Sequence, residues 1–365
     1  MTGWGGSPTY TYHAEECLNV EDRLEQPPRS RSKKPTQMDV ARLAAVSQPV
    51  VSYVLNNDAL APVAAETRQR VLSAIEQLGY VPDRAARSLR TRKTFTIAGI
   101  IPDITNAFYP AFERGIQDVA ESHGYDLIVY NTDGDAGKES RFSMSVQGRV
   151  DGIVAVFFHL TANDLRPLLE RHVAVVRLEA TRQEIGPLPL DNLYVDNVAA
   201  ARDAVAYLVG RGHRRIGMIA GHGGPRQPRV RGYRQALTEH GIEIDTRLIL
   251  ETEFVESGGY EATRALLWIS PRPTAIFAAN DLLAMGALVA LRDAGLGVPD
   301  DVAVVGFDDI PVARLTGPPL TTVAQFPQQL GRRAAELLFE RLAGLAPAGG
   351  RREECPYELV IRESA

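Results

Sequence analysis

Five side chains that could contact the edges of DNA bases cluster near the start of one predicted helix. They are Gln48, Pro49, Val50, Ser52 and Tyr53. Amide and hydroxyl groups can hydrogen-bond to bases, and small apolar groups can touch a thymine methyl. Ser47 would cap the helix, and Pro49 fits its first turn, where a missing N–H removes no helical bond. This arrangement predicts contact with the DNA major groove.

The surrounding residues predict the helix-turn-helix that would hold this cluster in place. The small residues 45–47 form a turn, and a third helix over Glu66–Leu78 stops at Gly79. A third helix is needed because two short helices bury too little surface to be stable. The side chains expected to face the core are Val40, Leu43, Ala44, Val51, Val54, Leu55, Val71, Leu72, Ile75 and Leu78. The alternative is a small helical domain with no role in DNA binding.

A series of motifs in this segment points to a known family. They are Asp39-Val-Ala41, Val46-Ser47, Val51-Ser52, Val54-Leu-Asn56, Thr67-Arg68, Ile75 and Leu78-Gly-Tyr-Val-Pro82. Together they resemble the DNA-binding head of the lactose/galactose repressor (LacI/GalR) family of bacterial transcription regulators. The resemblance continues through nearly all of the chain after residue 34.

The resemblance implies further DNA contacts outside the first cluster. Arg84-Ala-Ala-Arg-Ser-Leu-Arg90 is similar to the family's hinge helix, in which the leucine matching Leu89 inserts into the minor groove. Thr36, Ser47, Asn56, Arg84 and Arg87 are the other residues expected to contact DNA. The alternative for Leu89 is packing against the rest of the protein.

Charge and composition fit such a protein. Between Arg29 and Lys93 there are 12 basic and 5 acidic residues, whereas the whole chain carries a net charge of −5. A basic segment on an acidic chain fits a protein that places one end on phosphate groups. Cys17 and Cys355 have no metal or redox spacing, no cofactor is expected, and no apolar run predicts a membrane span. We therefore expect a cytoplasmic protein.

Four segments are predicted. Residues 1–34 are expected to be a disordered basic tail, 35–80 an all-α helix-turn-helix head, 81–93 a hinge helix and 94–365 a body. From Thr94 onward, strand and helix patterns alternate twice, which predicts an α/β body of two doubly wound parallel sheets. The resemblance implies a two-lobed body like the periplasmic binding proteins. Its N-subdomain would comprise about 94–192 and 303–325, and its C-subdomain 193–302 and 326–365, with crossings near 192, 302 and 325.

The resemblance also implies which residues bind a small-molecule effector in the cleft between the lobes. Asp281 follows a strand and could accept hydrogen bonds from sugar hydroxyls or a purine N–H, although it could instead cap a helix. Arg229 offers a planar fork of donors. Phe108, Tyr109 and Phe254 would supply aromatic faces. Gly306-Phe-Asp-Asp309 resembles a family signature that could be structural. A sugar effector is favoured over a purine, which would use the same side-chain types.

The sequence departs from the family at five positions. Ala45 stands where glycine is usual, Pro49 and Tyr53 replace common recognition-helix residues, Ala64 replaces a serine cap and Ala107 a proline. The operator could therefore differ from the common palindrome.

The expected function is a homodimeric, ligand-responsive regulator, most often a repressor, which binds a palindromic operator. A leucine heptad repeat near the C-terminus would suggest a tetramer, and the sequence has none there, so a dimer is expected. The alternative is a two-lobed sugar-binding protein of transport type, which would need an export signal and no basic head. An enzyme is disfavoured because no nucleotide fingerprint, nucleophile elbow or metal spacing occurs.

Overall fold

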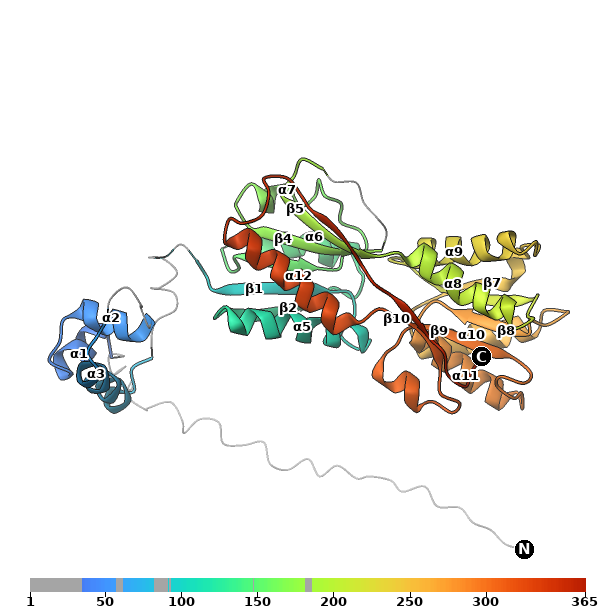
Figure 1. Ribbon diagram of the computed structural model, residues 1–365, viewed down its shortest axis with the longest axis horizontal. Helices are drawn as coiled ribbons and strands as arrows, with labels where there is room; N and C mark the ends of the chain where they lie inside the picture. The colour runs from blue at the N-terminus through green and yellow to red at the C-terminus, as the bar shows by residue number, and fades with distance from the viewer. Residues whose placement is uncertain (1–34, 57–61, 82–90, 92, 147, 181–185) are drawn as a thin grey trace, which may run out of the picture. The chain divides into compact units, whose positions relative to one another are not determined.

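The computed structural model describes residues 35–56, 62–81, 91, 93–146, 148–180 and 186–365. The chain divides into two compact units, Met1–Asp83, which contains the head, and Arg84–Ala365, the body (Figure 1). The expectations for the tail 1–34 and for nearly all of the hinge 81–93 lie outside the described residues.

The described part of the head folds into the three helices that the sequence predicts. They are α1 (Gln37–Leu43), α2 (Gln48–Asn56) and α3 (Ala65–Leu78). Val40, Val51 and Val71 are fully buried where the three helices meet. Leu43 and Leu72 were expected in this core but are 49% and 45% exposed. Their neighbours Ala44, just after α1, and Val71 on α3 line the core as predicted, and the two leucines point away because successive helical residues point about 100° apart.

Local hydrogen bonds set the ends of these helices. The Thr36 hydroxyl accepts from the Asp39 N–H at 3.3 Å, and the Asp39 carboxylate accepts from the Thr36 N–H at 3.0 Å. This reciprocal capping box starts α1. Gly79 ends α3 with a φ of 57°, in the left-handed region that favours glycine. Ala45, in the turn before α2, has a φ of 52°.

The body contains two six-stranded sheets, one in each lobe. The first lobe has strand order β11-β5-β4-β3-β1-β2, and the second β12-β10-β9-β8-β6-β7. All paired strands are parallel except β10 and β12. The prediction of two doubly wound sheets is therefore confirmed, with one antiparallel edge strand in addition.

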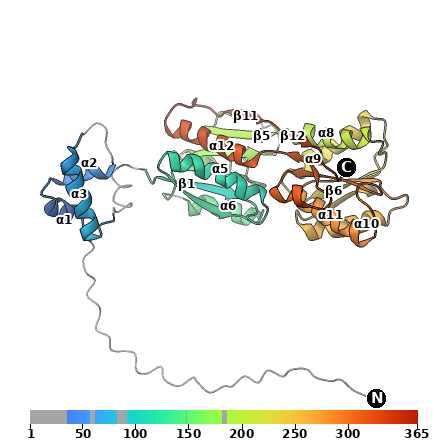
Figure 2. The same ribbon diagram turned by 60° about the horizontal axis from the view of Figure 1, so that its bottom comes forward.

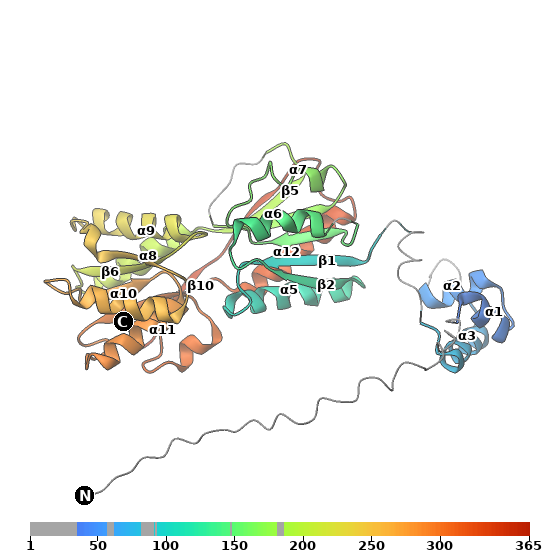
Figure 3. The same ribbon diagram turned by 180° about the vertical axis from the view of Figure 1, so that it is seen from behind.

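Helices cover both faces of each sheet. In the first lobe, α5 and α12 pack on one face, and α6 and α7 on the other. In the second lobe, α8 and α9 lie on one face, and α10 and α11 on the other (Figure 3). The bounds in the first lobe are β1 (Thr96–Ile101), α5 (Phe108–Ser122), β2 (Asp126–Asn131), α6 (Ala136–Ser145), β3 (Gly152–Ala155), α7 (Arg166–Leu169), β4 (Ala174–Glu179), β5 (Leu190–Val195), α12 (Pro327–Leu342) and β11 (Arg352–Cys355).

The second lobe follows the same alternation. Its elements are α8 (Asn197–Gly210), β6 (Ile216–Gly221), α9 (Arg226–Glu239), η1 (Thr246–Leu248), β7 (Ile249–Thr252), α10 (Glu256–Leu267), β8 (Ala275–Ala278), α11 (Asp281–Asp293), β9 (Ala303–Asp308), η2 (Pro311–Leu315), β10 (Thr321–Ala324) and β12 (Glu358–Val360). No helix among the described residues is long and apolar enough to cross a membrane.

The predicted division of the C-terminal third between the lobes is wrong. Residues 303–325 were assigned to the first lobe, but β9 and β10 belong to the second sheet. The short β8-α11-β9 crossover explains this, because it places β9 directly beside β8, where Ala303 pairs with Ala275. The chain then returns to the first lobe as α12 and β11 and ends in the second lobe with β12 (Figure 2). The crossing near 192 is confirmed. The crossing near 325 exists but runs from the second lobe to the first, so the assignment of 326–365 to the C-subdomain is wrong for α12 and β11, and the third crossing lies near 356 instead of 302.

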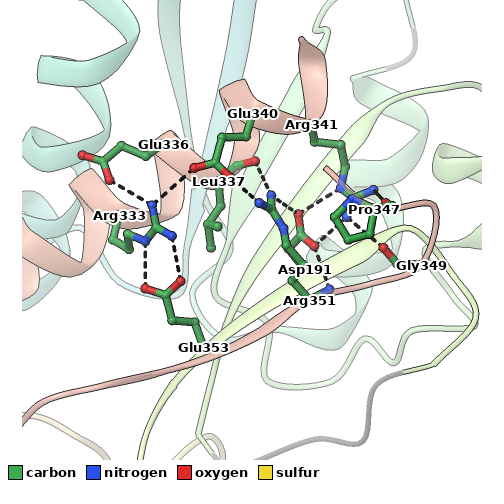
Figure 4. Close-up of polar contacts among 10 residues, drawn as sticks. All are labelled: Asp191, Arg333, Glu336, Leu337, Glu340, Arg341, Pro347, Gly349, Arg351 and Glu353. Atoms are coloured by element: carbon green, nitrogen blue, oxygen red, sulfur yellow. Dashed lines mark hydrogen bonds and ion pairs between the residues drawn. The ribbon is translucent and has the colours of Figure 1, made fainter. Parts of the chain in front are cut away.

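An ionic network around the buried Asp191 fastens this returning segment to the first lobe (Figure 4). Asp191 of β5 is fully buried and accepts from Arg341 at 2.6 Å and from Arg351 at 2.9 Å. Burial raises the pKa of Asp191, but the hydrogen bonds from the two arginines outweigh this effect and lower it. Arg333 of α12 donates to Glu353 of β11 at 2.7 Å and 2.8 Å. Charge-assisted bonds of this kind fix both register and orientation.

Candidate functional site

The head exposes most of the predicted DNA-contacting cluster on one helix. Ser47, Gln48 and Pro49 are exposed at the start of α2, and Tyr53 is 39% exposed one turn later. Val50 is half-buried. The Ser47 carbonyl accepts from the N–H groups of residues 50 and 51, so this residue does begin the helix. An exposed first helical turn suits contact with base edges.

The other residues predicted to contact DNA differ in outcome. Ser52 is only 9% exposed, so its side chain faces the interior of the head and not the outer surface as expected. The reason is its position next to Val51 on the packed side of α2. Thr36 is exposed, but its hydroxyl is engaged in the capping box. The side chain of Asn56 and the residues Arg84, Arg87 and Leu89 lie outside the described residues.

The body contains a cavity of about 1080 Å³ between its two lobes. Loops that follow the carboxyl ends of strands in both sheets form its walls, which is where ligands bind in doubly wound folds. The polar residues that line it include Asn106, Asp133, His159, Glu179, Asn197, His222, Arg226, Arg229, Glu253, Asn280, Asp308 and Gln325. A cavity of this size accommodates a ligand at the upper end of the usual range for small molecules.

Arg229 is a buried cation at the wall of the cavity. It lies in the first turn of α9 and is only 4% exposed. Its Nε donates to Asn197 at 2.8 Å, its Nη1 donates to the carbonyl of Ala279, and its Nη2 lies 3.6 Å from Oδ1 of Asp308. Its Cζ lies 3.7 Å from the centre of the Phe307 ring. These contacts hold the guanidinium in one orientation.

Asp308 is the matching carboxylate. It ends β9 with a φ of 119° and is 5% exposed, and its Oδ1 accepts from Gln325 at 2.7 Å. Burial raises the pKa of Asp308 to about 6, although the guanidinium of Arg229 and the bond from Gln325 oppose the shift. The pair therefore places a donor and an acceptor side by side at the cavity wall.

The predicted aromatic residues also line the cavity. The rings of Phe108 and Tyr109 meet edge to face, with centroids 5.2 Å apart. Burial and the charge of Asp308 raise the pKa of Tyr109, so its hydroxyl stays protonated. Phe254 of the second lobe lies against Gly221, where a side chain would collide with its ring. Apolar ring faces beside a polar pair suit the two kinds of surface on a sugar.

Asp281 does not line the cavity, contrary to the prediction. It is fully buried, and its carboxylate accepts from the N–H of Ile310 at 2.9 Å and from the hydroxyl of Thr322 at 2.5 Å. Burial, together with the charge of Asp308, raises its pKa well above the usual value. The helix cap is Asn280, whose Oδ1 accepts from Leu283 at 2.9 Å. Asp281 thus ties α11 to β10 and to the loop after β9.

The sequence reasoning missed several residues that line the cavity. Asp308 was noticed only as part of a signature, although its position at the end of a strand was a usable signal. Asn280 lines the cavity, and its buried Nδ2 has no partner among the described residues, which leaves this amide group free to donate to a ligand. Glu179 also lines the cavity, and its Oε1 lies 2.9 Å from Arg177.

Comparisons with known proteins agree with this geometry. Residues 36–83 match the family of bacterial regulatory proteins of the lacI type, and residues 205–365 match the periplasmic binding protein-like domain. The HTH-type transcriptional regulator DegA of Bacillus subtilis (strain 168) is 36% identical over 342 residues, which are 91% of this chain and 98% of that protein.

The chain belongs to the lacI family of bacterial regulatory proteins. Two solved structures in particular resemble this lacI family member. A lac repressor dimer bound to operator and the anti-inducer ONPF has a TM-score of 0.78 and 26% identity, over 91% of this chain and 99% of that one. A complex of the transcriptional regulator CelR with cellobiose has a TM-score of 0.67 and 33% identity, over 91% and 100%.

Membership of the lacI family decides between the functions considered from sequence. The chain is a ligand-responsive, DNA-binding transcriptional regulator, and the alternative of a transport-type sugar-binding protein is not supported. Its relatives are transcription regulators and not enzymes.

Proposed function

We propose that this chain is a dimeric repressor whose head binds a palindromic operator and whose cavity binds an uncharged sugar. The main support for the effector site is the Arg229–Asp308 pair, which lines the cavity together with Phe108 and Tyr109. No catalytic step or cofactor is part of the proposal. The proposed place of action is the cytoplasm, where operator DNA lies.

The charges of the cavity support an uncharged effector. Asp133, Glu179, Glu253 and Asp308 line it, against the guanidinium groups of Arg226 and Arg229, which both donate to protein acceptors. A phosphate or carboxylate would therefore meet more negative than positive side chains among the described residues, which leaves its desolvation poorly offset. The CelR structure, which contains cellobiose, supports a saccharide over a purine.

The edge of the first sheet supports a dimer. Strand β2 is an outer strand, and Ile128 and Val129 on it are each 39% exposed. In the second lobe, Leu315 is 75% exposed. Exposed apolar groups on a sheet edge favour association with another chain. Paired heads would then read two half-sites of a palindrome.

We propose that Gln48, Pro49, Val50 and Tyr53 contact bases, together with Ser47 at the start of α2. Thr36, Asn56, Arg84, Arg87 and Leu89 are proposed as further DNA contacts from the family resemblance. For the effector we propose Phe108, Tyr109, Arg229 and Phe254, with Asp308 in the role first given to Asp281.

Selection of random duplexes by the purified chain at about 0.15 M salt tests the proposal. We expect a palindromic consensus. Gln48→Ala should weaken binding by about 1–3 kcal/mol and relax the preference at one base pair in each half-site. Gln69→Ala is the matched control, because Gln69 is an exposed glutamine on α3. An enriched pool without a palindrome, or equal effects of the two variants, would contradict the proposal.

A further inference from the structure

The ring of Phe158 lies between loops of both lobes. Phe158 belongs to the first-lobe loop after β3, and Gly134 belongs to the loop after β2. A Cβ atom on Gly134 would lie 3.4 Å from Cδ2 of Phe158. In the second lobe, a Cβ atom on Gly223 would lie 3.4 Å from Cδ2, and one on Gly224 only 2.5 Å from Cε1. The ring therefore packs so closely on the backbone of Gly224 that a side chain at this position would collide with it.

The backbone that carries this ring is firmly held. Glu139 of α6 is fully buried, and its carboxylate accepts from the N–H groups of Phe158 at 2.8 Å, His159 at 2.9 Å and Leu160 at 3.1 Å. Nε2 of His159 lies 2.9 Å from the carbonyl of Gly134. Three bonds to one buried carboxylate make the loop rigid. The position of the ring is thus built into the first lobe.

The contact also lies on the wall of the cavity. Gly134, Phe158, His159, Gly223 and Gly224 all line it. The ring reaches the second lobe through space and not through one of the segments in which the chain crosses between lobes. If the lobes move apart, this contact breaks, while the crossing segments stay continuous.

We propose that Phe158 is the gate residue of the cleft, which seats on Gly223 and Gly224 when the lobes close. A ligand enters or leaves the cavity only when the ring has left this seat. The seat consists of two glycines without charged side chains, so closure is favoured by burial of the ring and not by an ion pair at the seat. The role of the cavity rests on the proposed function, but the contact itself can be measured without an effector.

Hydrogen–deuterium exchange of the full chain tests the gate. In Phe158→Ala, the amides of residues 222–230 should exchange about tenfold faster, because the ring no longer restrains the second-lobe loop. The amides of α10, on the other face of that lobe, should exchange as in the wild type and so report on global stability. Phe158→Leu keeps a shorter apolar side chain and should give an intermediate rate.

Phe157→Ala is the matched control. Phe157 is the neighbouring ring in the same loop, but it packs against Phe142 inside the first lobe, with centroids 6.2 Å apart. Exchange of 222–230 should not change in this variant. The gate is wrong if Phe158→Ala leaves the exchange of 222–230 at the wild-type rate, or if Phe157→Ala accelerates it equally. Loss of operator selection would instead contradict the proposed function, so the two failures are distinct.

Discussion

The Nη2 atom of Arg229 lies 3.6 Å from Oδ1 of Asp308, and the two side chains are only 5% and 7% exposed at the wall of the interlobe cavity. Arg229 comes from the start of α9 and Asp308 from the end of β9, so the pair depends on the packing of the whole second lobe. Each charge is tolerated there because the other is present.

Removal of Arg229 should destabilise the protein strongly. Arg229→Ala leaves Asp308 buried without its cation, and we expect the free energy of unfolding to fall by about 3–5 kcal/mol. Arg231→Ala is the control, since Arg231 is exposed two residues further along the same helix, and should change it by less than about 0.5 kcal/mol. Urea denaturation measures both. Similar small losses in the two variants would show that the pair contributes little.

Asp281 should matter for stability and not for direct effector contact. Asp281→Ala removes acceptors for the Ile310 N–H and the Thr322 hydroxyl, and we expect a loss of about 2–6 kcal/mol, from about 1–3 per unsatisfied buried group. Asp293→Ala, at the exposed end of the same helix, is the control. An Asp281→Ala protein of unchanged melting temperature that no longer bound its effector would restore the original interpretation.

Glu113 should make stability depend on pH. Its carboxyl group packs against Gly99 of β1, both oxygens lack a partner among the described residues, and burial raises its pKa from 4.5 to about 8. The folded state therefore keeps a proton that the unfolded chain releases between these values. The free energy of unfolding should fall as pH rises from about 4.5 to 8, by at most about 1.4 kcal/mol per pH unit, and then level off.

Glu113→Gln removes this titration. We expect the variant to gain stability relative to the wild type as pH rises through this window, as measured by denaturation at pH 5, 6.5 and 8. A constant difference between the two proteins across the series would contradict the buried, protonated carboxyl group.

Features of the fold that depend on residues close together in the chain could be predicted from the sequence, and features that depend on distant residues could not. Periodicity predicted α3 to within one residue, because the bounds of a helix depend on local patterns. It failed for Leu43 and Leu72, because the pattern did not decide which of two adjacent apolar residues on a helix faces the core. The lobe of β9 depends on which strand it pairs with, and no local pattern encodes that.

The candidate effector site shows the same limit. Arg229, Phe108, Tyr109 and Phe254 were predicted by their positions in motifs, and the structure brings all four to one cavity. Asp281 and Asp308 both follow or end a strand, and sequence alone did not distinguish them. The decision depends on Thr322 and Ile310, which engage Asp281 from distant parts of the chain.

Replacement of Ala45 by glycine should stabilise the head. Its φ of 52° lies in the left-handed region, which costs an alanine about 1–2 kcal/mol, while the greater freedom of glycine in the unfolded chain offsets part of the gain. We expect Ala45→Gly to stabilise the head by about 0.5–1 kcal/mol in thermal unfolding. Ala44→Gly, at a buried position with a φ of −78°, should instead destabilise it. Equal losses in both variants would argue against strain at Ala45.

The central claim is that the cavity controls DNA binding. The most direct measurement is the dissociation constant for the selected operator, with and without a panel of uncharged mono- and disaccharides that includes ribose and cellobiose, and with purine bases as a second arm. We predict that one saccharide changes the constant by about 5- to 150-fold. This response should disappear in Asp308→Asn, which should still bind the operator, and should persist in Asp309→Asn. A purine that acts where no saccharide does, or a response that survives in Asp308→Asn, would contradict the account.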